Sequence, residues 1–275
     1  MIGTDYTIGK QILNNMKTTM SKRQLANLMF VQGADDEREY ELILTAQAYY
    51  ACRDSITIGG KPLAADIIEP IRTGHTVNAM NLRHVVITSV DRDDIKNDYG
   101  AEIWAETIEQ IRIQAPECTI EVLTPDYRNY APAFEKVFKA EPDIFSHNIE
   151  CVERISRQVR PQSDWNRSLS VLQASIEWGL NTKTGMMVGL GENDSEVLET
   201  MQEIAELGIT IFNIGQYLQP TLNHLPVQRF VHPDIFKMYK ERGLEMGFRV
   251  VESGPLVRSS YHADEQAKRL EIANN

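Results

Sequence analysis

Cysteine is scarce in this 275-residue sequence, which contains only Cys52, Cys118 and Cys151. These residues are far apart, and neither a CxxC nor a CxxxCxxC motif occurs. An odd number of dispersed cysteines does not indicate a disulfide framework. The simplest interpretation is three small buried hydrophobic residues or incidental thiols, although the sequence leaves open whether two of them meet in space.

Long apolar runs and an excess of basic residues are also missing. No stretch approaches the roughly 18 consecutive apolar residues of a membrane helix, and the N-terminus lacks a basic-then-apolar signal. The chain has 28 Lys+Arg against 39 Asp+Glu, a net charge of -11, which argues against nucleic acid or anionic lipid as a partner. We expect a cytoplasmic protein, or a mitochondrial or plastid matrix protein if the source is eukaryotic.

From about residue 80 onward, short apolar segments alternate with segments of helical periodicity. The strand candidates are rich in Val, Ile and Phe and are bounded by turn formers: 84–90, 119–124, 143–148, 182–191, 210–218 and 247–254. The helix candidates have apolar residues near i, i+3, i+4 spacing: 100–115, 131–140, 164–179, 194–207 and 233–246. Asp194 and Ser195 are the expected cap of the fourth helix. This alternation predicts βαβ units around a parallel sheet, with sequential strands as neighbours.

The first 80 residues have a different pattern. Residues 10–51 have mostly helical periodicity, and DSITIGG (54–60) is compatible with one further strand. We therefore expect a helical N-terminal extension over 1–53, a partial βα barrel over 54–254 and a C-terminal tail over 255–275 that covers the open mouth.

Polar residues gather directly after the predicted strands. They include Asp91 after the first of the six, Asn148 and Glu150 after the third, Glu192 after the fourth and Gln216 after the fifth. Because the carboxyl ends of parallel strands meet at one edge, these side chains predict a ligand site there. Ordinary loop polarity is the alternative.

Eight blocks over residues 82–270 resemble lipoyl synthase, a family of radical S-adenosylmethionine enzymes. Their order along the chain is the same as in that family, and RSSYHA following GPLVR is especially distinctive. The blocks are HVVITSVDRDD (84–94), TIEVLTPDYR (119–128), FSHNIECV (145–152), VRPQSDWNRSL (159–169), TKTGMMVGLGE (182–192), IGQYLQP (214–220), HLPVQRFVHPDIF (224–236) and SGPLVRSSYHADEQAKRL (253–270).

The resemblance implies a radical-SAM-type partial (β/α)6 barrel, similar to a TIM barrel but open on one side. It implies a transferase of lipoate biosynthesis that inserts two sulfurs into a protein-bound octanoyl chain. The implied cofactors are S-adenosylmethionine (SAM) and [4Fe-4S] clusters, and the implied partner is an octanoylated lipoyl-carrier domain or an H-protein-like substrate. By position in the blocks, the implied SAM contacts are Ser89, Asp91, Asn148, Glu150, Arg160, Arg167 and Lys183.

The sequence departs from the family in its cluster ligands. The family binds one cluster through a CxxxCxxC loop and a second through an N-terminal cysteine triplet, and both motifs are missing here. SITIGG runs directly into KPLAADIIEPI, which resembles the family sequence on both sides of the missing loop. By the same resemblance, Cys52 is a remnant of the triplet and Ser260 is the vestigial serine ligand of the second cluster. Three dispersed cysteines do not supply the thiolates for two clusters, and the six histidines form no HxH or HxxxH pair.

Three hypotheses for the function therefore stay open. The first is a lipoyl synthase by descent, competent only if the missing elements are supplied otherwise. The second is a cluster-less relative that binds SAM or an octanoylated carrier domain. The third is an inactive truncated variant, which would be poorly stable because a barrel without its first loop loses ordering contacts.

Overall fold

In the described part of the chain, seven parallel strands form one sheet in which every strand pairs with the next along the chain. The computed structural model describes residues 40–43, 65–89, 91–220, 222 and 224–270. The sheet order is β1-β2-β3-β4-β5-β6-β7, and β1 and β7 are not paired with each other, so the barrel is open. The strands are β1 (Tyr40–Ile43), β2 (His84–Thr88), β3 (Thr119–Leu123), β4 (Ile144–Ser146), β5 (Asn181–Val188), β6 (Ile211–Gln216) and β7 (Val250–Gly254).

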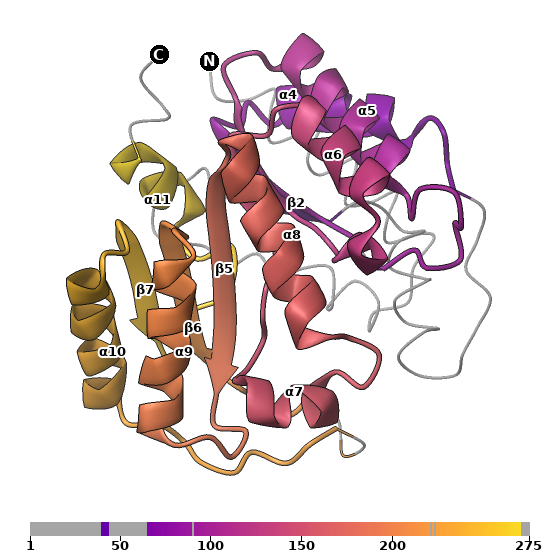
Figure 1. The fold of residues 1–275 in the computed structure, drawn as a ribbon. Coiled ribbons are helices and arrows are strands. Elements are labelled where there is room, and N and C mark those ends of the chain that lie inside the picture. Colours follow the sequence, from indigo (N-terminus) through magenta and orange to yellow (C-terminus); the bar gives the residue numbers. More distant parts are fainter. Residues whose placement is uncertain (1–39, 44–64, 90, 221, 223, 271–275) are drawn as a thin grey trace.

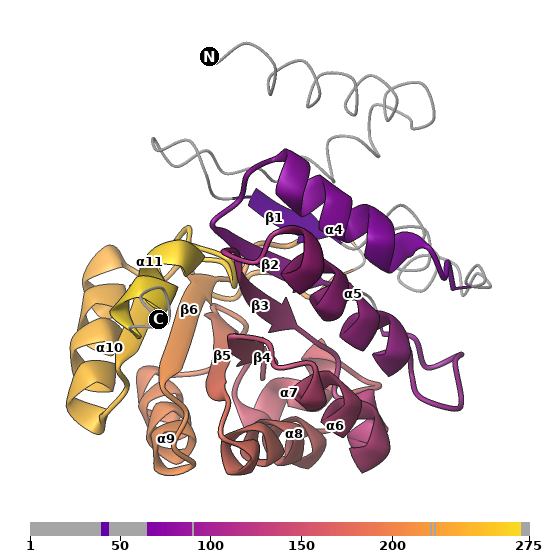
Figure 2. The same cartoon turned by 90° about the horizontal axis from the view of Figure 1, so that it is seen from above.

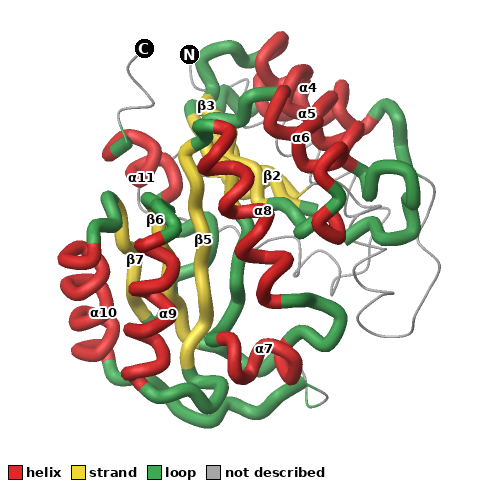
Figure 3. Tube along the Cα trace, in the orientation of Figure 1, coloured by secondary structure: helices red, strands yellow, loops and turns green. Residues whose placement is uncertain are grey.

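The helices that connect these strands pack on the outside of the sheet (Figures 1 and 3). Their bounds are α4 (Glu69–Ala79), α5 (Ala101–Gln114), α6 (Ala131–Lys139), α7 (Glu153–Val159), α8 (Trp165–Trp178), α9 (Asp194–Glu206) and α10 (Pro233–Met246), with a short 3-10 turn η1 (Tyr127–Asn129). A further helix, α11 (Ala263–Arg269), follows β7. None of the helices in the described part of the chain is long and apolar enough to cross a membrane.

Two buried hydrophobic clusters separate the helices from the sheet. One is built around β2 to β4 and includes Val85, Ile120 and Phe145, and the other is built around β5 to β7 and includes Val188, Ile214 and Val251. Alternate residues of the same strands point into the barrel, as the period of two along a strand requires. Glu121, Lys183 and Asn213 are therefore interior polar groups.

The predicted partial barrel is confirmed. The predicted strands 84–90 and 119–124 are parallel neighbours in the sheet. His84 lies opposite Thr119, and the register continues to Thr88 opposite Leu123. All five predicted helices are present with ends that differ by one residue at most. The cap of α9 differs, because Asn193 accepts a hydrogen bond from the Glu196 amide and Glu196 reciprocates, which makes a capping box.

The N-terminal prediction needs a correction. Tyr40–Ile43 lie within the segment expected to be helical, but they form β1 and pair in parallel with β2. A short apolar segment with few turn formers is compatible with a strand as well as with a helix. This segment forms a strand because its backbone pairs with the edge of the sheet at β2. The predicted strand 54–60, Cys52 and the rest of the 1–53 extension lie outside the described residues.

The C-terminal tail does not simply cover the mouth of the barrel. After β7, its backbone passes along the inner side of β6, where Asn213 donates a hydrogen bond to the carbonyl of Ser259. Helix α11 then packs Ala267 and Leu270 against the first residues of three strands: Ile144, Ile211 and Val250. Figure 2 shows β6 between α11 and the outer helix α9. The tail thus runs from the carboxyl ends of the strands to their amino ends.

Replacement of Phe145 by alanine tests the outer core. Phe145 is fully buried and its ring lies 5.0 Å from that of Phe138. We expect Phe145→Ala to lower the free energy of unfolding by about 3–5 kcal/mol, because the lost contacts leave a cavity. Phe230, which is 75% exposed, provides the matched control, and Phe230→Ala should change stability by less than about 0.5 kcal/mol. Denaturant titrations of both variants measure the difference, and equal effects would contradict this packing.

Candidate functional site

Four of the predicted site residues come together where β2 and β4 end. These residues, which we call the polar cluster, are Asp91, Asn148, Glu150 and Arg160. Arg160 is the centre of the cluster: its Nη1 donates to the Asn148 carbonyl at 3.1 Å, and its charge acts on both Asp91 and Glu150. Segments after β2, after β4 and after α7 thus meet at the carboxyl edge of the sheet, as the strand order predicts.

A local backbone arrangement holds Glu150 in place. Its φ of 69° lies in the left-handed region, which is uncommon for a residue other than glycine. Its amide donates to the Gly185 carbonyl at 3.1 Å, and its carbonyl accepts from the Met187 amide at 2.8 Å. This bridge to β5 extends the sheet beyond β4 and offsets the cost of the conformation, so the Glu150 side chain has a defined direction.

The two carboxyl groups of the polar cluster have similar electrostatic surroundings. Burial raises the pKa of Glu150, while Arg160 and a hydrogen bond from Asn148 act in the opposite direction. Burial also raises the pKa of Asp91, and Arg160 again opposes the shift. Asp91 is nevertheless exposed and Glu150 is half-buried, so solvent reaches both side chains. Surrounding protein removes part of their hydration without closing them off, which favours contact with a cationic group.

Arg167 joins the polar cluster only through an intermediate carboxylate. Its Nε donates to Asp126 at 3.0 Å, and its Nη2 donates to the Gln162 carbonyl at 3.0 Å. Asp126 in turn is close enough to Asp91 to raise the pKa of that carboxyl. The structure therefore places Arg167 beside the polar cluster and uses its charge to neutralise Asp126.

Strain in the backbone accompanies Asp126. The next three residues, Tyr127, Arg128 and Asn129, all have positive φ, at 46°, 54° and 56°. Each left-handed residue of this kind costs about 1 kcal/mol or more. The hydrogen bond from Arg128 Nε to Asp93 at 2.7 Å and the burial of Tyr127 hold the turn in place. The turn connects the loop after β2 to the loop after β3 at the rim of the candidate site.

His147 is a buried link between the ends of β3 and β4 and the start of α8. Its Nδ1 lies 2.8 Å from the Thr124 carbonyl, which can only accept, so Nδ1 is the protonated nitrogen. Its Nε2 then accepts from the Ser168 hydroxyl at 3.0 Å. Burial lowers the pKa of His147 to about 4, so the ring is neutral at pH 7. His147 lies at the end of the third predicted strand, near Asn148 and Glu150, but only the fold shows its two partners.

Lys183 lies inside the barrel and forms an ion pair instead of contacting the polar cluster. Its Nζ lies 2.8 Å from Glu121 Oε1, and the two side chains are 1% and 0% exposed. His84 Nε2 is 3.9 Å from the same carboxylate. A ligand at the rim does not reach Lys183 unless this pair is broken, so the structure gives Lys183 a role in the barrel interior.

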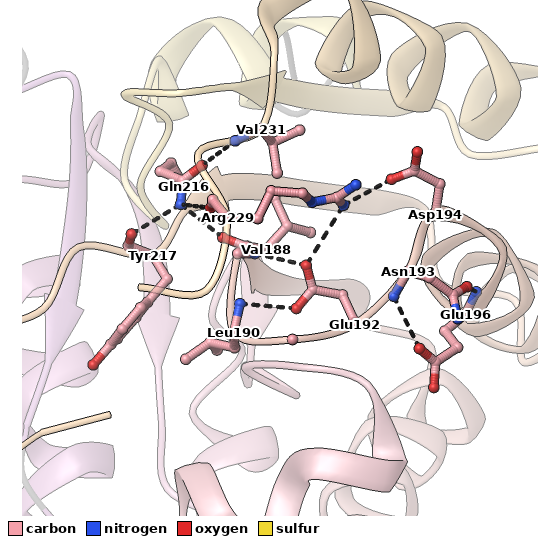
Figure 4. A network of polar contacts seen from close by, with 12 residues as sticks. Val188, Leu190, Glu192, Asn193, Asp194, Glu196, Gln216, Tyr217, Arg229 and Val231 are labelled. Atoms are coloured by element: carbon pink, nitrogen blue, oxygen red, sulfur yellow. Dashed lines mark hydrogen bonds and ion pairs between the residues drawn. The ribbon is translucent and has the colours of Figure 1, made fainter. Parts of the chain in front are cut away.

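The polar side chains at the carboxyl ends of β5 and β6 form hydrogen bonds to other groups of the protein (Figure 4). Glu192 accepts hydrogen bonds from the amides of Gly189 and Leu190 at 2.6 and 2.9 Å, and Arg229 lies 3.8 Å from its carboxylate. Gln216 donates to the carbonyls of Val188, Tyr217 and Arg229, and accepts from the Val231 amide. These contacts fix the segment around Arg229 to the strand ends. Glu192 and Gln216 therefore support the rim and are not directed at a ligand.

Ser89 directly follows β2, and Ser260 lies in the tail between Ser259 and α11. A residue that sequence reasoning did not single out is Ser259, whose hydroxyl accepts a hydrogen bond from Asn148 Nδ2 at 2.8 Å. The RSSYHA motif pointed to this segment, but only the course of the tail shows that Ser259 contacts the polar cluster.

The described thiols do not fit an iron–sulfur cluster. Cys118 precedes β3 in one outer hydrophobic cluster, and Cys151 follows β4 in the other, so they lie at opposite ends of the sheet. Burial raises the pKa of each thiol to about 12, which opposes the thiolate form that binds iron. Within the described ranges, no group of three or more His, Cys, Asp and Glu side chains is arranged to hold a metal ion.

Comparison with known proteins agrees with this architecture. The model of the radical SAM superfamily matches residues 47–204. Among solved structures, methylornithine synthase (PylB) has a TM-score of 0.51 at 13% identity, covering 94% of this chain and 91% of that one. Streptococcus suis SuiB bound to S-adenosylmethionine has a TM-score of 0.54 at 10% identity, over 75% and 47% of the two chains. At such low identity these structures show the fold alone, the open barrel of this superfamily.

Two curated relatives narrow the assignment. The chain is 50% identical over 220 residues to the lipoyl synthase of Rubrobacter xylanophilus, covering 79% of this chain and 68% of the relative. It is 47% identical over 214 residues to the lipoyl synthase of Parabacteroides distasonis, covering 78% and 76%. The chain therefore belongs to the lipoyl synthase family of the radical SAM superfamily.

The ion pair inside the barrel gives a test by stability. We expect Lys183→Met to lower the free energy of unfolding by about 3–5 kcal/mol, because it leaves the Glu121 carboxylate buried without its cation. The matched control is Lys237→Met, since the Lys237 side chain is 74% exposed and should contribute less than about 0.5 kcal/mol. Urea titrations of both variants measure the effect. A Lys183→Met variant as stable as the control would show that the amino group is not buried against Glu121.

His147 predicts a specific pH dependence of stability. Its pKa is lowered to about 4 in the folded protein, so the unfolded chain binds the proton first as the pH falls below about 6.5. Stability should therefore decrease between pH 6.5 and 4, by about 2 kcal/mol at pH 5 from this residue alone. In His147→Gln that part of the pH dependence should disappear, whereas His232→Gln, at an exposed histidine, should retain it. Parallel pH profiles for His147→Gln and the wild type would contradict a buried neutral ring.

Proposed function

We propose that this chain binds SAM at the polar cluster, as a member of the family that inserts two sulfur atoms into a protein-bound octanoyl chain in lipoate biosynthesis. The observation that supports this proposal is the convergence of Asp91, Asn148, Glu150 and Arg160 at the carboxyl edge of the sheet. Parallel α/β barrels place their active sites at this edge.

The chemistry of the polar cluster matches the charges of SAM. The ligand has a cationic sulfonium, an amino group, a carboxylate and ribose hydroxyls. Glu150 and Asp91 offer carboxylates to the cationic and hydroxyl groups, and Arg160 offers a guanidinium to the carboxylate. Arg167 is a secondary candidate for that carboxylate, since Asp126 already accepts a hydrogen bond from it. Lys183 is not part of the proposed subsite.

The sulfur-insertion reaction of the family needs iron–sulfur clusters in addition to SAM. The described thiols of this chain do not fit such a cluster, because they are buried in separate hydrophobic clusters. We therefore derive no reaction step through a cluster. The function that the geometry supports is binding, and catalysis depends on cluster ligands that the described residues do not provide.

We further propose an octanoylated carrier domain as the protein partner, in keeping with the family. Exposed apolar side chains follow the carboxyl ends of β6 and β7, at the edge where the polar cluster lies. They are Leu218, Leu222, Phe230 and Leu256, with exposures of 49%, 95%, 75% and 65%. An acyl chain and a protein surface both require apolar contacts near the SAM subsite.

Calorimetry with SAM tests the proposal. The wild-type protein should release heat on binding SAM, and Glu150→Gln and Arg160→Met should each weaken binding by about tenfold or more, because each loses a charge-assisted contact. Affinity should also fall as the pH is lowered, since Glu150 and Asp91 have raised pKa values and lose their negative charge at a higher pH than an ordinary carboxyl.

Asp234→Asn is the control, because Asp234 is 86% exposed on α10 and should leave the affinity unchanged. Iron and sulfide are measured in the same anaerobically purified protein. Absence of heat with SAM would overturn the proposed binding. About four irons per chain would overturn the conclusion that this chain alone lacks the ligands for a cluster.

A further inference from the structure

The C-terminal tail passes close to the inner face of β6, where a glycine leaves room for it. Gly215 on β6 has no side chain, and a Cβ added there would lie 2.2 Å from the carbonyl oxygen of Val257. Its φ is not in the left-handed region, so the backbone of this strand does not itself require glycine. The missing side chain therefore serves the approach of the tail.

Asn213, two residues earlier on the same face, binds the tail backbone. Its Nδ2 donates to the carbonyls of Arg258 at 3.3 Å and Ser259 at 3.0 Å. The Asn213 side chain is almost fully buried, with 3% exposure. Asn213 and Gly215, which we call the tail seat, thus fix the position of residues 257–259 by a hydrogen-bond donor and by an opening in the sheet.

The seated tail then reaches the polar cluster through one side chain. Ser259 Oγ accepts from Asn148 Nδ2 at 2.8 Å, across 111 positions of sequence. The backbone carbonyl of Asn148 accepts from Arg160, and its side-chain amide also donates toward Glu150. A continuous chain of contacts therefore runs from the tail seat through Ser259 and Asn148 to the charged groups of the polar cluster.

We propose that Ser259 is a positioning residue for the polar cluster, and that the tail seat holds it in place. Ser259 fixes the orientation of the Asn148 side-chain amide, and this orientation sets where Glu150 is presented to a ligand. The effect on SAM rests on the proposed function, whereas the effect on the loop at 147–151 does not. By thermodynamic linkage, a ligand that needs an ordered Asn148 also stabilises the seated tail.

Hydrogen exchange of the full chain without ligand tests the tail seat. Gly215→Ala should increase exchange at least tenfold at the Val257 and Tyr261 amides, which bond to the carbonyls of Gly254 and Arg258, because the new methyl excludes the Val257 carbonyl. It should also increase exchange over 147–151. Gly254→Ala is the matched control, since its Cβ meets only Val257 Cγ2 at 3.4 Å and should change neither segment.

Ser259→Ala and Ser259→Thr separate positioning from folding. The alanine variant loses the hydroxyl and should speed exchange over 147–151 and weaken SAM binding by about three- to tenfold. The threonine variant keeps the hydroxyl and should restore both properties. These variants leave Gly215 unchanged, so they decide the proposal even if Gly215→Ala fails to fold.

Each outcome of these experiments supports or overturns either the positioning role or the proposed function. If Gly215→Ala or Ser259→Ala frees the tail while exchange over 147–151 stays at the wild-type rate, Ser259 does not position Asn148 and the proposal is wrong. If the wild type binds no SAM but exchange over 147–151 responds to Ser259→Ala and recovers in Ser259→Thr, the proposed function fails and the positioning role stands. If threonine does not restore the wild-type rate, the hydroxyl is not the cause and the proposal is again overturned.

Discussion

The parallel pairing of all neighbouring strands is the constraint on which the candidate site depends. It directs the carboxyl ends of β2 and β4 to the same edge, so Asp91 and Glu150 meet there although 59 positions separate them in the sequence. It also makes the inward residues of each strand face a shared interior, where Lys183 pairs with Glu121 from β3. A lysine and a glutamate so far from water are stable only because the register places them within 2.8 Å.

The sequence allowed most of this fold to be predicted, for physical reasons that also explain the exceptions. Strands such as 84–88 and 119–123 are short, β-branched and bounded by turn formers, and each has an amphipathic helix after it. The sequence does not predict α11, although Ala263, Ala267 and Leu270 have helical spacing, because a helix of 7 residues is too short for a clear periodic pattern. The sequence predicts a helix at Tyr40–Ile43 because nothing local distinguishes a short apolar strand from a helix, and its partner β2 lies more than 40 residues away.

The sequence predicted which strand ends contribute residues to the candidate site, but not which side chains at those ends point into it. Position after a strand indicated Asp91, Asn148 and Glu150, and the structure brings these residues together because parallel strands have a fixed direction. It could not distinguish these residues from Glu192 and Gln216, which follow strands in the same way but bind backbone groups of their own loops. That distinction depends on side-chain direction and on close approaches such as Gly189, where an added Cβ would lie 2.3 Å from Gln216 Nε2. Residue type and spacing contain neither kind of information.

The distribution of charge at the rim determines which kind of ligand is favoured. Arg167 is paired with Asp126, and Arg128 with Asp93, so these guanidinium groups are already neutralised within the protein. Among the described residues, the charge of Arg160 acts on both Asp91 and Glu150, and Arg128 also acts on Asp91. Because Arg128 is shared with Asp93, an excess of negative charge remains at the centre of the polar cluster. Because partial burial weakens solvent screening, this excess attracts a cation more strongly than an exposed carboxylate would. A sulfonium compound carries the positive charge that this excess favours. A phosphate or a free acid would be repelled by the carboxylates and would also lose its hydration.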